Sequence, residues 1–337
     1  MSEIQEVADK HRQALRKNEA NALKTMNTAF KRIEFELMER AQVLLTDLEA
    51  QQSVASFLRL RRTKELLADI DRFMGNHAQR TLRDVIISLA ESALNEAQDH
   101  ADELIRAALG PSPNAKLLPI ASLSEAQIVE IVGTMKNGPL ARLLDGFGRV
   151  AAEHARRELL FGVALGEHPS KVARRLRRSL NITNQRAYLI ARTEQLRAYR
   201  EGTRQFYDAN KHIVQKWIWS ASLSPRTCAA CWALHGQEFD TNERMANHPA
   251  CRCSMVPKTK TWKELGFSNV PESRPDFPRG TDLFDKQSES VKRTVLGPAA
   301  FDAYKRGDVK LEDFIHVDRS RTWGTTYRRG SLANALK

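Results

Sequence analysis

The sequence predicts an α+β protein that is predominantly α-helical. Long N-terminal helices are followed by a small α+β domain with a cysteine-rich knuckle on a short β-sheet. Three observations lead to this prediction. Residues 1–109 contain no proline and a single glycine, and strong helix formers dominate them. An alternation of large side chains that is typical of a strand begins at residue 213. All four cysteines lie between residues 228 and 253, which indicates a local structural constraint.

The first 109 residues carry two apolar stripes at helical spacing. Side chains three and four positions apart share one face of a helix, and these faces form either the core of a bundle or a surface for a neighbouring subunit. Residues 110–113 read Gly-Pro-Ser-Pro and end the region, because proline and the residue before it do not continue a helix. We therefore expect a helical region over residues 1–109. The stripes are Phe30, Ile33, Leu37, Ala41, Leu44 and Leu48, then Leu66, Ile70, Phe73 and Met74.

Residues 110–165 are predicted to form a helical connecting region. Ser124 and Gln127 have the spacing of a capping box, in which the two side chains satisfy backbone amides at the start of a helix. A longer helix is expected from about residue 140 to residue 165.

A short two-faced helix that begins at Ser170 carries the densest positive charge of the chain. Cations on one helix face can contact successive phosphates and gain free energy from counterion release. Solvated helix faces show the same pattern, so both interpretations stay open. A further helix is expected over residues 185–210. The cations are Lys171, Arg174, Arg175 and Arg178 on the polar face, with Arg177 on its flank.

The cysteines follow a predicted strand over residues 213–220, which carries two tryptophans on one face. Phe239 is expected in a second short strand, and residues 252–256, ended by Pro257, in a third. The sequence thus predicts a small sheet on which loops, not helices, present the sulfurs.

Cysteine spacing favours a metal site. A Cys-x-x-Cys pair on a tight turn can direct two thiolates at one point, and a second pair completes a tetrahedron around zinc. The preferred ligands are Cys228, Cys231, Cys251 and Cys253, with His248 as a substitute for either late cysteine. His235, just before a glycine, is interpreted as a turn residue. Disulfides and plain packing of reduced thiols are the alternatives to a structural Zn²⁺.

The C-terminal part begins with a proline-rich loop over residues 269–280. Helices are expected from about residue 287 and again up to about residue 307. Residues 319–337 form a basic tail without a clear pattern, which we expect to become ordered on binding. The predicted domain therefore spans residues 166–318. Four tail arginines are further candidates for DNA contacts: Arg319, Arg321, Arg328 and Arg329.

Composition limits the partners of the chain. Its 337 residues include 53 basic and 41 acidic side chains, a formal net charge of +12. Such a balance suits an acidic partner, with nucleic acid favoured over membrane, or a merely cationic surface. No apolar run reaches the ~20 residues of a membrane span, and the charged N-terminus does not resemble a signal peptide. We therefore expect folding in a reducing cytoplasm, which favours metal or free thiols over disulfides.

From about residue 166 onward the order of motifs resembles the phage head morphogenesis family, the Mu F-like minor head proteins. The matching segments are GEHPSKVARRL, IARTEQLRAYREG, KWIWSA, SPRTCAACWALHGQEF, HPACRC and LGPAAFDAYKRGDVKLEDF. Ser224 departs from the pattern, since many relatives have an aspartate there. The resemblance implies a minor capsid protein of the virion, associated with the portal vertex. It would be incorporated during procapsid assembly in the host cytoplasm and would contact packaged double-stranded DNA.

The resemblance also implies the partners, which are the portal protein, the major capsid protein or a scaffold protein. We expect no enzymatic activity and name no catalytic residue. Two other readings of the residues stay open. One is a stand-alone zinc-stabilised nucleic-acid-binding module. The other is a nuclease or hydrolase that uses a metal or a cysteine, which would need an open coordination place or a histidine partner.

Overall fold

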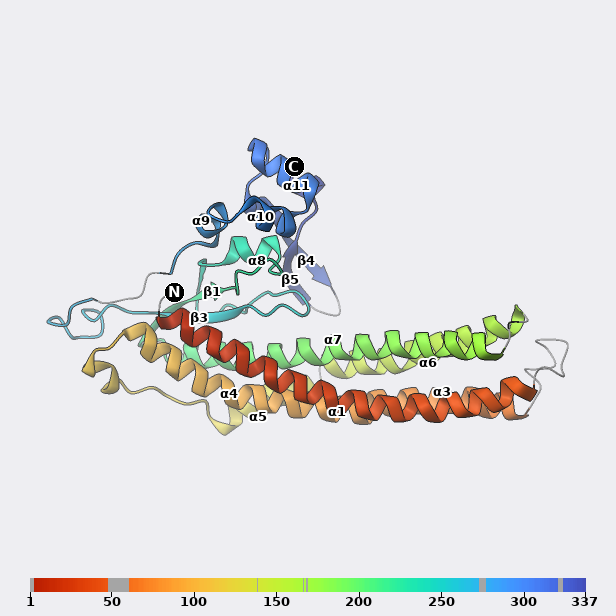
Figure 1. The fold of residues 1–337 in the computed structure, drawn as a ribbon. Coiled ribbons are helices and arrows are strands. Elements are labelled where there is room, and N and C mark those ends of the chain that lie inside the picture. Colours follow the sequence, from red (N-terminus) through yellow and green to blue (C-terminus); the bar gives the residue numbers. More distant parts are fainter. Residues whose placement is uncertain are drawn as a thin grey trace. The chain divides into compact units, whose positions relative to one another are not determined.

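The computed structural model describes residues 3–47, 61–137, 139–165, 167, 169–272, 277–320 and 324–337 (Figure 1). The chain forms two compact units, each assembled from separated segments. Unit 1 comprises Met1–Lys17, Ala90–Val132 and Leu196–Lys337, and unit 2 comprises Asn18–Leu89 and Gly133–Gln195. The predicted ranges 1–109, 110–165, 166–318 and 319–337 stay predictions about the organisation of the chain. In the described part of the chain, no helix is both long enough and apolar enough to span a membrane.

Unit 2 is helical. It is formed by parts of α1 (Glu3–Asp47), α4 (Arg83–Leu109) and α7 (Pro169–Ala209), together with α3 (Arg61–Asn76), the π-helical turn η2 (His77–Leu82) and α6 (Pro139–Ala164). Its core confirms both predicted stripes, because Phe30, Leu37, Leu66 and Ile70 are buried together against α6 and α7. The described residues of both stripes therefore form part of an intramolecular core. The side chain of Leu44 and the whole of Leu48 lie outside the described residues.

One long helix, α7, stands where the sequence predicted two shorter ones. Thr183 and Asn184 are weak helix formers, yet both are buried, and the Thr183 hydroxyl and the Asn184 amide nitrogen have hydrogen-bond partners. The Thr183 hydroxyl donates to the Ser179 carbonyl at 3.0 Å. The Asn184 amide donates to Asn27 Oδ1 at 3.1 Å and to the Tyr188 hydroxyl at 3.0 Å. Tertiary packing thus overrides the local preference for a break.

The helices of unit 1 include the first turns of α1, most of α4, the 3-10 turn η3 (Pro113–Lys116) and the start of α5 (Glu125–Asn137). The predicted capping box is confirmed: the Ser124 amide donates to Gln127 Oε1 at 2.9 Å, and the Gln127 amide donates to Ser124 Oγ at 3.3 Å. Buried Arg12 on α1 donates to the hydroxyls of Ser220 at 3.0 Å and Ser254 at 2.9 Å. The N-terminal helix is thereby joined to the sheet.

The sheet of unit 1 is antiparallel, in the order β2 (Glu238–Phe239), β1 (Val214–Ser220) and β3 (Ser254–Thr259). The three predicted strands are present. Trp217 and Trp219 of β1 are fully buried, and the Trp217 ring stacks on Phe239 at 4.4 Å. We expected the third strand to end at Pro257, but β3 continues to Thr259 because it is an edge strand, where proline is tolerated.

Short elements complete unit 1 after the sheet. They are α8 (Ala229–Leu234), α9 (Gly280–Asp285), α10 (Glu289–Leu296), α11 (Pro298–Arg306), the 3-10 turn η4 (Leu311–Phe314), β4 (Ile315–Ser320), β5 (Gly324–Arg329) and α12 (Leu332–Ala335). Helices α9, α10 and α11 surround Trp232 of α8, whose ring meets Phe284 edge-on at 5.2 Å. The described part of the proline-rich segment 269–280 lies between β3 and α9 and, up to residue 279, is irregular, as predicted.

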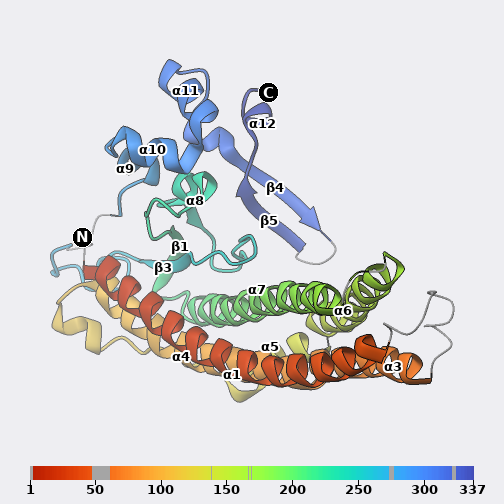
Figure 2. The ribbon, with the colours of Figure 1, turned by 45° about the vertical axis from the view of Figure 1, so that its right-hand side comes forward.

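The C-terminal residues are ordered, whereas the sequence predicted an irregular tail. β4 and β5 form an antiparallel hairpin with Ile315 opposite Arg329 and Ser320 opposite Gly324 (Figure 2). Packing explains the order: Thr326 is buried, and the Tyr327 ring lies 6.2 Å from that of Trp219.

Candidate metal centre

Helix α8 positions the first two thiols. Cys228 is the N-cap residue of α8, and Cys231 lies in its first turn. A turn fixes the entry to the helix, in which the Thr227 amide donates to the Ser224 carbonyl at 2.9 Å. The Ser224 amide in turn donates to Thr227 Oγ1 at 3.1 Å. Our prediction that loops present all the sulfurs is therefore wrong for Cys231, because the short buried run Ala229–Leu234 is helical.

The other candidate ligands lie on the loop between β2 and β3. The Cys251 amide donates to the His248 carbonyl at 3.1 Å, which closes a turn. Ala250 within this turn has a φ of 59°, a left-handed conformation that costs an L-residue roughly 1–2 kcal/mol. Two contacts hold the loop: Trp217 Nε1 donates to the Glu243 carbonyl at 3.2 Å, and the Tyr327 amide donates to the Ala246 carbonyl at 2.6 Å. The strained turn is thus maintained by its surroundings.

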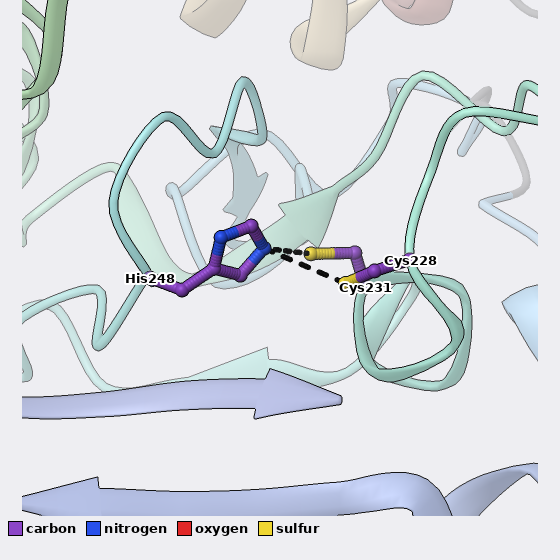
Figure 3. Close-up of side chains that lie close together, drawn as sticks. All are labelled: Cys228, Cys231 and His248. Carbon is purple, nitrogen blue, oxygen red and sulfur yellow. Dashed lines mark hydrogen bonds between the residues drawn. The ribbon is translucent and has the colours of Figure 1, made fainter. Parts of the chain in front are cut away.

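The structure brings both halves together, as Figure 3 shows for three of the side chains. Nε2 of His248 lies 3.4 Å from Cys228 Sγ and 3.5 Å from Cys231 Sγ. The sulfurs of Cys231 and Cys251 are 3.7 Å apart. The ligand atoms form two overlapping triads, Cys228–Cys231–His248 and Cys231–Cys251–Cys253, in which all atoms lie within 4.8 Å of one another.

These distances match the edges of a zinc tetrahedron. Zinc–sulfur bonds of about 2.3 Å and zinc–nitrogen bonds of about 2.0–2.1 Å give sulfur–sulfur edges of about 3.8 Å and sulfur–nitrogen edges of about 3.5–3.6 Å. The observed separations are 3.7 Å, 3.4 Å and 3.5 Å. His248 Nδ1 lies 2.9 Å from the Pro249 carbonyl. This contact places a proton on Nδ1 and directs Nε2 at the sulfurs, so that Nε2, once it has lost its own proton, is oriented as in metal-bound histidines.

A disulfide does not describe this cluster. All four cysteines are free thiols in the structure, and the Cys231–Cys251 separation of 3.7 Å is far from the ~2.05 Å of a disulfide bond.

Proton sharing within the cluster shifts the pKa values of its members. Hydrogen bonds from Cys231 and then His248 lower the pKa of Cys228 to about 5, against the opposing effect of burial. Hydrogen bonds from Cys231 and Cys253 hold the pKa of Cys251 well below its usual range. Burial lowers the pKa of His248, but hydrogen bonds to Cys228 and Cys251 outweigh it and raise that pKa to about 10. The cluster therefore contains thiolates that are stabilised by protons shared with neighbouring groups. A divalent metal ion can replace these protons.

His235 lies outside the groups of possible metal ligands that the described residues form. It is the C-cap residue of α8 and is buried. Its Nδ1 accepts a hydrogen bond from the Ala221 amide at 3.0 Å, and its ring stacks on Phe277 at 4.8 Å. Burial lowers its pKa to about 4, so the ring is neutral and has a packing role.

Arg200 of α7 contacts the cysteine loop, and our sequence analysis did not single it out. Its Nε and Nη2 donate to the Cys253 carbonyl at 2.9 and 2.8 Å, and Nη2 also donates to the Cys251 carbonyl at 2.5 Å. When the side-chain amide of Asn247 is oriented so that its nitrogen and its oxygen both have hydrogen-bond partners, the oxygen accepts from Nη1 of Arg200 at 2.8 Å. Only 4% of Arg200 is exposed. A local pattern could not reveal a contact across more than 50 residues.

The predicted DNA-contacting cations have different surroundings. In unit 2, Lys171 and Arg175 pair with Glu167, and Arg177 pairs with Glu34. In unit 1, Arg328 pairs with Asp318, and Arg329 donates to the Leu296 carbonyl at the end of α10. Three cations are exposed and have no ion pair among the described residues, and a fourth lies outside those residues. The three are Arg174, Arg178 and Arg319, and the fourth is Arg321.

In a comparison with protein families, residues 153–256 match the model of the family described as Phage Mu protein F like protein. The resemblance expected from the sequence motifs is therefore confirmed over this segment, which runs from α6 through α7 to β3 and contains all five candidate metal ligands. The C-terminal segment 296–314, for which the sequence motifs led us to expect the same resemblance, lies beyond the matched range. Comparison with curated proteins and with solved structures gave no match.

Proposed function

We propose that this chain is a minor structural protein of a phage head, bound at or near the portal vertex and acting in capsid assembly. The match of residues 153–256 to the Mu F-like family carries the proposal. The portal protein and the major capsid or scaffold protein are its proposed partners. It would be assembled in the host cytoplasm and would remain in the virion.

The cysteine cluster has a structural role in this proposal: it binds one Zn²⁺ that cross-links α8 to the loop before β3. Cys231, Cys251 and Cys253 are buried, and five candidate groups surround a place that needs four. A catalytic zinc needs a coordination place open to water and substrate. The buried, ligand-rich cluster therefore favours a structural site over a hydrolase or nuclease.

Contact with packaged DNA is the second part of the proposal. Arg174 and Arg178 are one turn apart on the exposed side of α7. Each phosphate contact makes the slope of the logarithm of the binding constant against the logarithm of the salt concentration more negative by about 0.9. Replacing both by glutamine should weaken non-specific duplex binding and reduce this slope by about 2. Arg175→Gln serves for comparison: Arg175 already pairs with Glu167 at 2.6 Å, so its loss should change the slope by much less than half of this amount. An effect of Arg175→Gln that is half as large as that of the double variant, in proportion to charge alone, would contradict a special phosphate-binding role for Arg174 and Arg178.

The assembly role is tested by co-expressing the chain with the capsid, scaffold and portal proteins of its own phage. We expect it to co-sediment with procapsids in few copies, and to be lost from them when the portal protein is omitted. Procapsids that never contain the chain would overturn the proposed function. Equal incorporation without the portal protein would overturn the portal location.

A further inference from the structure

The cluster offers five candidate groups for four coordination places, and the surroundings of Arg200 indicate which four are used. Arg200 carries a guanidinium with 4% exposure, and among the described residues its hydrogen bonds go to the neutral oxygens of Cys251, Cys253 and Asn247. A buried charge is costly unless an opposite charge compensates it. Among the described residues, the structure gives no carboxylate that pairs with Arg200. The loop whose carbonyls Arg200 binds carries the thiol groups of Cys251 and Cys253, which supply the opposite charge when they are deprotonated.

Charge balance separates the possible ligand sets. Three thiolates and one neutral imidazole around a dication leave one negative charge, which a single guanidinium cancels. Four thiolates would leave two negative charges for the same guanidinium. The geometry points in the same direction, because His248 Nε2 lies at coordination-edge distances from two sulfurs, and Cys251 Sγ lies at such a distance from Cys231.

We propose that Arg200 is the positioning and charge-balancing residue of the metal centre, and that the four ligands are Cys228, Cys231, His248 and Cys251, with Cys253 left as an uncoordinated thiol. The inference rests on the proposed zinc site. By holding two carbonyls and the Asn247 oxygen with one planar fork, Arg200 fixes the strained loop before the metal arrives. Its charge then stabilises the thiolates and the loaded centre.

The role of Arg200 is tested on the full chain by zinc affinity in competition with a chelating dye. Loss of a group that supports metal ligands typically costs 10–100-fold in affinity, and we expect a loss of this size for Arg200→Gln. Arg200→Lys keeps the charge but not the fork, so it should recover part of the loss. The matched control is Arg204→Gln, one turn further along α7, where Arg204 pairs with Glu201 at 2.8 Å. It should bind zinc like the unchanged chain.

Charge balance has its own readout, the pH at which Co²⁺ binds. Removing a positive charge beside thiolates raises the pH needed to deprotonate them. The midpoint pH of Co²⁺ binding should therefore rise in Arg200→Gln and return towards its original value in Arg200→Lys. A merely structural effect would not restore the midpoint with the lysine. Arg200→Lys also keeps the test valid if the glutamine variant does not fold.

The ligand set is tested by the thiolate-to-cobalt charge-transfer band of the Co²⁺-loaded chain. Cys253→Ser should keep the band and one bound ion, whereas Cys251→Ser should weaken both. The opposite result would overturn the ligand assignment, and an Arg200→Gln variant that binds zinc as tightly as the original chain would overturn the role of Arg200. If the unchanged chain binds neither ion, the zinc site of the proposed function fails as well. Failure of the ligand assignment or of the role of Arg200 can thus be distinguished from failure of the zinc site itself.

Discussion

Replacing Gly280 by alanine should destabilise unit 1, because the first residue of α9 lies directly against α8. A Cβ atom there would stand 2.0 Å from the Trp232 carbonyl oxygen and 2.7 Å from Cβ of His235. Both atoms belong to the segment that carries Cys231, so α9 must move away by about an ångström or more. Overpacking of this kind costs typically about 1–3 kcal/mol. The movement also weakens the 2.8 Å hydrogen bond from the Gly280 amide to the His235 carbonyl, worth about 1 kcal/mol. We therefore expect a loss of about 2–4 kcal/mol in the free energy of unfolding.

The loss is measured by urea denaturation followed through tryptophan fluorescence, since Trp217, Trp219 and Trp232 are fully buried in unit 1. Gly330→Ala is the matched control in the same unit. Its new Cβ would meet its nearest atom at 3.4 Å, an ordinary contact, and alanine reduces the entropy of the unfolded chain, so stability should stay the same or rise by up to about 1 kcal/mol. Equal stabilities of the two variants would refute the close approach of α9 to α8.

Three further predictions concern unit 1. Burial, with a smaller contribution from His11, lowers the pKa of His100 from 6.5 to about 4, so the unfolded chain takes up the proton first. The contribution of neutral His100 to the free energy of unfolding is complete above pH 6.5 and is lost as the pH falls towards about 4. His100→Phe should flatten this pH dependence of stability in urea titrations. Arg12→Met should cost about 1.5–3 kcal/mol in the same assay because two hydroxyls lose a charged donor. Exposed Lys10→Met should change stability by less than about 1 kcal/mol. Removing metal with a chelator should lower the urea midpoint of the original chain, and an unchanged midpoint would contradict a stabilising metal.

Regular patterns in the sequence predicted much of the fold. The stripe through Phe30 and Leu37 is buried as expected, and Ser124 caps α5 through the contacts that its spacing to Gln127 predicts. These features depend on helical periodicity and on side chains within one turn, which the sequence displays directly. The predicted strands around Trp217 are correct for the same reason.

Features that depend on tertiary contacts could not be predicted in this way. The continuity of α7 through Thr183 depends on polar partners on another helix and one turn away. The order of the C-terminal hairpin depends on Tyr327, which packs on Trp219 more than 100 residues earlier. The cysteine spacing singled out the five groups that the structure brings close together, but it left open which four of them would bind a metal. Arg200 escaped notice because an arginine in a helix gives no local sign of carbonyl partners on a distant loop.

Whether a metal ion cross-links α8 to the loop before β3 can be decided from the zinc content of the purified full chain. Elemental analysis should be combined with counting of reactive thiols in the folded protein. We expect about one zinc per chain, with thiols that react only after chelation. A chain that contains no metal and whose four thiols react freely would contradict this expectation.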